Sequence, residues 1–179
     1  MKKVILLLIL ASSLYSGNHT ILFSLFSKHI ESTDMHGDTF NEENYGVGYQ
    51  YSTSGDTYLT FSAVALKDSY KHNMYTTTLG INKSVLQKNG IGVSLGAEFG
   101  VAYKAVKHSN KKEVDLLAES GVTLKKKVTY EYSPVPILLV PKVTISYKQF
   151  SVNILYIPEV EIQSNPVDAV LWATFGYTF

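Results

Sequence analysis

Apolar and polar residues alternate with a period of two along most of the chain. In residues 91–105 the odd positions are apolar, and the even positions carry mainly glycine, serine, glutamate and lysine. This alternation is typical of a β-strand with two different faces. The segment is longer than the about 9–11 residues that a tilted strand needs to cross a membrane. Residues 74–86 and 142–147 repeat the pattern.

Eight segments of this kind predict eight strands. They cover residues 19–30, 43–52, 57–67, 74–86, 91–107, 136–147, 150–157 and 169–179. An even number of antiparallel strands closes into a barrel without a free edge, and closure is required because lipid cannot hydrogen-bond an open backbone. We therefore predict an all-β fold, an eight-stranded antiparallel transmembrane β-barrel.

The two faces differ in a way that indicates which one meets lipid. A soluble, lipocalin-like barrel is the alternative, and it would turn its apolar face inward. The polar face here contains lysine, glutamate, asparagine, serine and glycine, so we expect it to line the interior. The last strand ends at Phe179, and an aromatic terminal residue after such alternation resembles the C-terminal signal of bacterial outer-membrane barrels. We expect a location in the bacterial outer membrane.

The lengths of the connections predict the direction of the barrel. Short connections at 53–56, 87–90 and around 148–149 alternate with longer ones at 31–42, 68–73, 108–127 and 158–168. Outer-membrane barrels have short turns in the periplasm and longer loops outside. Both ends of the barrel domain are then periplasmic.

The first residues have the composition of a secretory signal peptide. Lys2 and Lys3 precede an apolar run, and small serines follow it, so we predict a signal peptide over residues 1–16 and a barrel domain over 17–179. The apolar run is shorter than the roughly 20 residues of a membrane-spanning helix.

The composition argues against several kinds of partner and chemistry. The net charge of +1 and the lack of a dense basic cluster predict no nucleic-acid partner. The absence of cysteine excludes disulfides and thiolate catalysis. The five histidines do not pair with Asp or Glu at a metal-ligand spacing, so we predict no metal site and no cofactor.

One group of residues has the chemistry of a catalytic site. His29 ends the first predicted strand, while Asp68 and Ser69 follow the third, and the alternating strand directions put all three at the outer rim. A histidine, a carboxylate and a hydroxyl together can carry out acyl transfer. The same residue types are also ordinary at a rim and in a turn. The pattern alone therefore leaves a structural barrel open.

Five short fragments occur in the order found in one enzyme family. They are Ser27-Lys28-His29, residues 40–48, residues 65–70, the proline-containing residues 134–141, and residues 155–158. Together they resemble the lipid A palmitoyltransferase (PagP) family of Gram-negative outer membranes. Tyr70 stands where the family has tryptophan, and the family's amphipathic helix before the first strand has no counterpart here.

The resemblance implies an acyltransferase that needs no cofactor. Such an enzyme moves a palmitoyl chain from the sn-1 position of a phospholipid donor to a lipid A acceptor within the membrane, and we expect it to act as a monomer. By the resemblance, the family's functional His, Asp and Ser fall on His29, Asp68 and Ser69. As hypotheses for their roles, we assign His29 as the general base on the acceptor hydroxyl, and Asp68 as the group that orients His29 or balances its charge. On the same hypothesis, Ser69 is either an acyl carrier or an oxyanion donor.

The resemblance also implies how substrate is held. Gly80 corresponds to the glycine that forms the floor of the family's acyl pocket. Pro141 and Pro158 lie where a gap between the sixth and seventh strands would admit lipid from the side. Two other functions stay open, namely a non-catalytic barrel with a structural or interaction role, and a lipid A deacylase that uses water as the acceptor.

Overall fold

The computed structural model describes residues 17–30, 40–109, 128–158, 160–162, 165–167 and 169–179. The predicted signal peptide lies outside the described residues. The strands are β1 (Asn18–His29), β2 (Gly46–Ser52), β3 (Thr57–Lys67), β4 (Asn73–Lys88), β5 (Ile91–Ser109), β6 (Val128–Tyr147), β7 (Phe150–Ile157), β8 (Val160–Ile162), β9 (Asn165–Val167) and β10 (Val170–Thr178).

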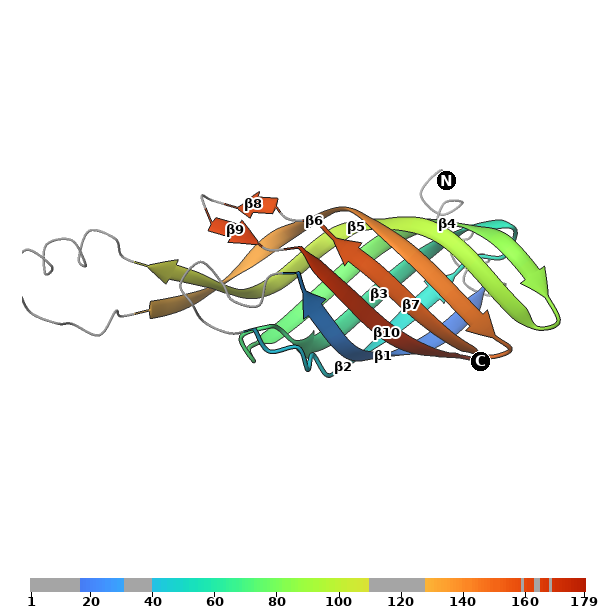
Figure 1. Ribbon diagram of the computed structural model, residues 1–179, viewed down its shortest axis with the longest axis horizontal. Coiled ribbons are helices and arrows are strands. Elements are labelled where there is room, and N and C mark those ends of the chain that lie inside the picture. Colours follow the sequence, from blue (N-terminus) through green and yellow to red (C-terminus); the bar gives the residue numbers. More distant parts are fainter. Residues whose placement is uncertain (1–16, 31–39, 110–127, 159, 163–164, 168) are drawn as a thin grey trace, which may run out of the picture.

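Eight of the described strands form one closed antiparallel barrel. Their order around the wall is β1-β10-β7-β6-β5-β4-β3-β2, so the first and last strands pair with each other and close the sheet. The strands run steeply tilted to the long axis of the molecule (Figure 1). The predicted fold class is confirmed. The described part of the chain contains no helix long and apolar enough to cross a membrane.

The outer surface of the barrel is apolar. Phe61, Leu79 and Phe99 are cross-strand neighbours on β3, β4 and β5, and they expose 43%, 48% and 56% of their surface. A soluble barrel would bury such a row, because exposed apolar patches of this size cost free energy in water. Polar residues such as Thr60, Ser62 and Thr78 are buried in the interior instead. The apolar face is therefore the lipid face.

Short and long connections occupy opposite ends of the barrel, as the sequence predicts. The tight turns 53–56, 89–90 and 148–149 lie at the end that holds the C-terminus (Figure 1). Asn89 and Gly90 both have positive φ, of 53° and 80°, which fits the type I′ turn favoured by an Asn-Gly hairpin. The strand ends that flank the longer connections lie at the other end, which is the outer end by the rule for outer-membrane barrels.

Two strand predictions differ from the structure at the outer end. β6 begins at Val128 rather than at residue 136, and β8 and β9 form a small separate sheet in a segment predicted as a loop. Pro134 lies in the part of β6 that was not predicted and Pro136 at the predicted start, although proline cannot donate to a ladder. Both prolines pair with β5. The opposite edge of β6 forms no ladder with β7 at these positions, so the missing N–H groups break no hydrogen bond there. Figure 1 shows the resulting β5–β6 hairpin projecting beyond the other strands.

The ladder between β6 and β7 is incomplete. It runs from Tyr147 opposite Phe150 to Lys142 opposite Leu155 and ends there. On its other side, β7 continues to pair with β10 as far as Ile157. The next residue of β6 is Pro141, which has no N–H to extend the ladder. The outer part of the wall therefore lacks backbone pairing between these two strands.

The interior has an apolar part and a polar part. The apolar part is a cluster of buried side chains, formed by Leu22, Val64, Leu66, Val140, Leu155 and Trp172. Next to it, Lys142 Nζ lies 2.5 Å from Glu98 Oε1, and Thr78 Oγ1 donates to Glu98 Oε2 at 2.9 Å. The lysine and glutamate side chains are almost fully buried. The sequence predicted the polar lining and did not predict the apolar cluster.

We expect the two charges to depend on each other. In Glu98→Gln the Lys142 ammonium is left buried without a counter-charge, which costs about 3–5 kcal/mol of unfolding free energy. The paired variant Glu98→Gln with Lys142→Met removes both charges and is expected to lose far less. Urea unfolding of the protein in lipid vesicles, followed by tryptophan fluorescence, measures both values. A single variant as stable as the parent would contradict this account.

Candidate functional site

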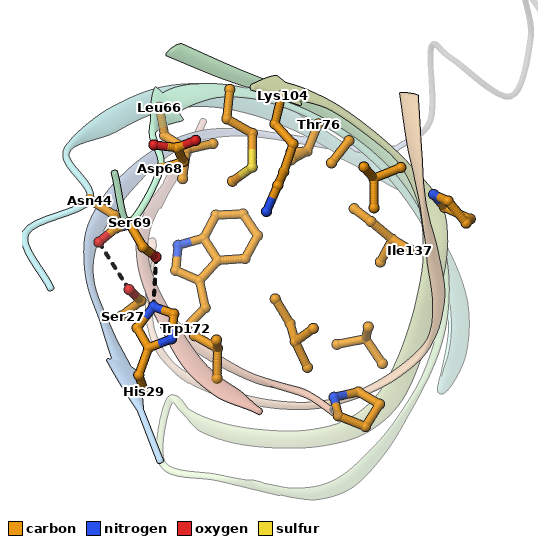
Figure 2. A pocket seen from close by; sticks show the side chains of 18 residues that line it. Ser27, His29, Asn44, Leu66, Asp68, Ser69, Thr76, Lys104, Ile137 and Trp172 are labelled. Carbon is orange, nitrogen blue, oxygen red and sulfur yellow. Dashed lines mark hydrogen bonds between the residues drawn. The ribbon is translucent and has the colours of Figure 1, made fainter. Parts of the chain in front are cut away.

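The structure brings His29 and Ser69 together at the outer rim. His29 is the last residue of β1, and Ser69 lies in the connection 68–72 that follows β3. His29 Nε2 and Ser69 Oγ are 2.6 Å apart and form a hydrogen bond (Figure 2). Only β2 separates β1 from β3 in the barrel wall, and β2 begins no earlier than Gly46. The two side chains therefore meet just beyond the end of β2.

Residues 40–45 hold this contact in place. The sequence predicted them as part of a loop and of the second strand, but they run along the rim as an irregular segment. Ser27 N donates to Glu42 O at 2.9 Å, and Asn41 N donates to Ser69 O at 2.8 Å. The Phe40 ring stacks on the His29 ring with centroids 3.8 Å apart and an angle of 8°. The segment thus links β1 to the Ser69 turn and restricts the imidazole.

Asp68 shapes the turn that presents Ser69. Its carboxylate is buried, and Oδ1 accepts hydrogen bonds from the backbone N–H of Tyr70 at 2.9 Å and of His72 at 2.8 Å. Adjacent residues in an extended strand point to opposite faces. β3 ends at Lys67, so Asp68 and Ser69 lie in a turn and both line the same cavity.

Asp68 and His29 line the same cavity, and their side chains form no hydrogen bond with each other. Among the described residues, His29 Nδ1 and Asp68 Oδ2 are buried and have no hydrogen-bond partner. The carboxylate therefore does not orient the imidazole as in a linear relay. Asp68 acts at this site through the turn that presents Ser69.

An apolar cavity opens beside the His29–Ser69 pair. The cavity and its open mouth together have a volume of about 920 Å³. Its apolar lining comes from several strands and includes Leu66, Met74, Ala102, Val135, Val140 and Trp172. His29, Asp68 and Ser69 lie along one side of it (Figure 2). The reactive groups are therefore next to a space suited to hydrocarbon.

The other predicted site residues divide between the cavity and its surroundings. Pro158 lines the cavity, and Pro136 also does so. Pro141 faces outward, beside the break in the β6–β7 ladder. Gly80 is buried inside the barrel but does not line this cavity. A methyl group on Gly80 would lie 2.5 Å from Thr60 Oγ1 and 3.0 Å from Glu98 Cγ.

Two lining residues were not singled out by the sequence. Lys104 on β5 directs its ammonium group into the cavity, and Trp172 on β10 lies across from it (Figure 2). Trp172 Nε1 donates to Ser24 Oγ at 2.8 Å, which satisfies the indole inside an apolar region. The alternation of β5 already put Lys104 on the inward face, and its position near the outer end was the available signal.

The arrangement can move a proton and carry an acyl group. A nucleophile and a base within hydrogen-bond reach are the basic geometry of covalent acyl transfer. A cation near the cavity mouth can stabilise negative charge that develops on a carbonyl oxygen. Within the described ranges, no group of three or more His, Cys, Asp or Glu side chains could hold a metal ion.

No protein-family model matches this chain, and no curated protein sequence matches it. Three kinds of solved structure are similar. Ail, the attachment invasion locus protein of Yersinia pestis, has a TM-score of 0.53 and 12% identity, over 91% of this chain and 97% of that chain. The N-terminal β-barrel domain of Pseudomonas aeruginosa OprF has a TM-score of 0.51 and 12% identity, over 90% and 99%. Neisserial surface protein A (NspA) has a TM-score of 0.50 and 11% identity, over 91% and 96%.

At sequence identities this low, the similarity to these structures shows a shared fold and nothing finer. Ail, OprF and NspA are barrels of the bacterial outer membrane, and this chain is an outer-membrane β-barrel as well. The predicted location is confirmed. The matches do not single out the palmitoyltransferase family.

We expect the His29–Ser69 hydrogen bond to be visible in solution. In Ser69→Ala the Nε2 atom loses its partner, so the ¹⁵N chemical shifts of the His29 ring should change. His19 lies at the opposite end of the barrel and contacts Tyr49, so its ring shifts should stay the same. Nitrogen NMR of histidine-labelled protein makes the comparison. Unchanged His29 shifts would mean that the two side chains do not interact.

Proposed function

We propose that this chain is an outer-membrane acyltransferase that moves a palmitoyl chain from the sn-1 position of a phospholipid to lipid A. The observation that supports this most strongly is the hydrogen bond between His29 and Ser69 at the mouth of the apolar cavity. A membrane barrel needs no such pair for stability, and the cavity beside it suits a fatty tail. The resemblance of five sequence fragments to the palmitoyltransferase family also supports an acyltransferase function.

The proposed reaction uses Ser69 as the acyl carrier. Ser69 Oγ attacks the ester carbonyl while His29 Nε2 takes its proton, and the lysophospholipid leaves with that proton. A lipid A hydroxyl then attacks the acyl-serine ester and gives its proton to His29, which returns it to Ser69 Oγ. Lys104 stabilises the oxyanion in both steps. If Ser69 instead donates a hydrogen bond to the oxyanion, His29 deprotonates the lipid A hydroxyl directly.

The break in the wall supports entry of the donor from the bilayer. Backbone pairing between β6 and β7 stops at Lys142, and Pro136 and Pro158 line the cavity near that region. An acyl chain could pass between the strands without leaving the apolar phase. A phospholipid therefore need not be extracted into water, which would cost about 0.8 kcal/mol for each methylene exposed.

A non-catalytic barrel is the second candidate, and the solved structures favour it. Ail is named an attachment invasion locus protein and NspA a surface protein, and neither name denotes an enzyme. On this alternative the chain serves a structural or interaction role at the cell surface. A lipid A deacylase is a third possibility, with water in place of the lipid A hydroxyl.

Mass spectrometry of lipid A from cells with and without the gene separates these functions. We expect a gain of one palmitoyl group on lipid A when the gene is present. Loss of one acyl chain would indicate a deacylase. Unchanged lipid A, with the barrel folded in the outer membrane, would indicate the non-catalytic alternative.

Substitutions at the site test the mechanism with purified protein. We expect His29→Asn and Ser69→Ala each to reduce transfer of labelled palmitate to lipid A by about 10²-fold or more, since general acid–base catalysis contributes on that scale. The matched control is His19→Asn, because His19 lies at the opposite end of the barrel. Its turnover should be unchanged. Near-normal turnover in both site variants would contradict the proposed chemistry.

A further inference from the structure

Lys104 carries a positive charge into the apolar cavity without a bonded partner. It is partly buried on the inward face of β5, one residue beyond the last pair of the β4–β5 ladder, and it directs its ammonium group into the cavity (Figure 2). Among the described residues, this ammonium group forms no hydrogen bond and no ion pair. Removing such a charge from water is costly, so a negative charge beside it would be stabilised.

Asp68 is a carboxylate on the same cavity, and it does not supply this negative charge by contact. It acts on Lys104 through space, without an ion pair between the two side chains. Its Oδ1 atom accepts hydrogen bonds from two backbone N–H groups of its own turn, and its Oδ2 atom is buried. The turn therefore holds this carboxylate in place, and the partner of the ammonium group must come from a ligand or from water.

The surroundings of Lys104 favour an anion that carries a hydrocarbon chain. Ala102 precedes it on the same face, and Val135 is the neighbour of Ala102 on β6. Further apolar lining comes from Leu66, Met74, Val140 and Trp172. A small hydrated anion would lose its water there and gain one ammonium group in return. An alkyl chain gains about fourfold in affinity for each methylene that leaves water for such a lining.

We propose that this cavity is a binding site for a free long-chain fatty acid and that Lys104 is the residue that pairs with its carboxylate. The carboxylate lies beside Lys104 near the cavity mouth, and the alkyl chain lies against the apolar lining. The inference goes beyond the proposed function, because it requires no acyl transfer. It holds equally for a non-catalytic barrel.

The position of the charge selects a fatty acid among anionic lipids. A fatty acid has its single negative charge at the first carbon of its chain, so the charge and the tail can be accommodated together. A lysophospholipid carries its phosphate on a glycerol headgroup, which would have to lose its hydration to reach Lys104. The fatty alcohol of the same length has the same tail and no charge, which makes it the matched reference ligand.

Trp172 reports the entry of a ligand, since it lies across the cavity from Lys104 and is the chain's one tryptophan (Figure 2). The purified protein is kept in an uncharged amphipathic polymer at neutral pH. A long-chain fatty acid brominated in mid-chain and the matching alcohol are titrated separately, and bromine quenches Trp172 when either enters. We expect the parent to bind the acid about tenfold or more tightly than the alcohol, since a hydrogen bond to a charged group contributes on that scale.

The decisive variant is Lys104→Met, which removes the charge and keeps an unbranched side chain. We expect it to lose the preference for the acid while its affinity for the alcohol changes little. Lys104→Arg keeps a cation and should keep most of the preference. Lys67→Met is the matched control, because Lys67 lies at the same end of the barrel on the outer surface, where it donates to Asn73. This control should prefer the acid as the parent does.

Several results would overturn the fatty-acid site. They are a parent that does not prefer the acid, a preference that survives in Lys104→Met, and an equal loss of preference in Lys67→Met. Lysophosphatidylglycerol of the same chain length that binds as tightly as the acid would also overturn it. If Lys104→Met does not fold, carbon NMR of a carboxyl-labelled fatty acid tests the parent alone. The pKa of the bound carboxyl should lie below that of the acid in the polymer without protein, because the ammonium group favours the ionised form. An equal or higher pKa would contradict the ion pair.

The outcome is separable from that of the proposed function. If the acid binds through Lys104 but lipid A gains no acyl group, the fatty-acid site stands and the acyltransferase proposal fails. If lipid A gains a palmitoyl group but the acid binds no better than the alcohol, the acyltransferase proposal stands and the fatty-acid site fails.

Discussion

A peptide group surrounded by lipid has no water to bond with, so each strand of this barrel must be paired by its neighbours. The closed order of eight strands meets that requirement over most of the wall. Among the described strands, pairing stops early in the outer part of β6, where Pro141 follows the last pair with β7. Prolines are tolerated there because they present no N–H group to lipid. This interruption of the ladder lies beside the apolar cavity, whose lining includes Pro136 and Pro158.

The same demand determines what can be placed inside. Inward positions are shielded from lipid and can carry charge, provided that each charge is matched. Glu98 and Lys142 meet this condition deep in the lumen, while His29, Asp68 and Lys104 remain near the mouth. The apolar cluster around Trp172 lies between these two polar groups. Along the barrel axis, the interior thus has the candidate catalytic residues at the outer end, an apolar section in the middle and a polar section below it.

Much of the fold could be predicted from the sequence, because a two-residue period and the connection lengths are local signals. They gave the strand count, the lipid-facing side and the rim position of His29, Asp68 and Ser69. Three features were not predictable from local pattern. The start of β6 depends on which edge of the strand is unpaired, the Phe40–His29 stack depends on an irregular segment, and the cavity depends on how side chains of distant strands pack. The resemblance to a family suggested Gly80 as the floor, but only the paired strands reveal that Glu98 lies over it.

The ion pair joins two strands that are consecutive in the chain. Glu98 and Lys142 are diagonal neighbours on β5 and β6, so their charges can neutralise each other as soon as this single hairpin forms. A barrel that enters a membrane hairpin by hairpin would then not expose either of these two charges alone to the hydrocarbon phase. This buried ion pair would then pose no electrostatic barrier to insertion.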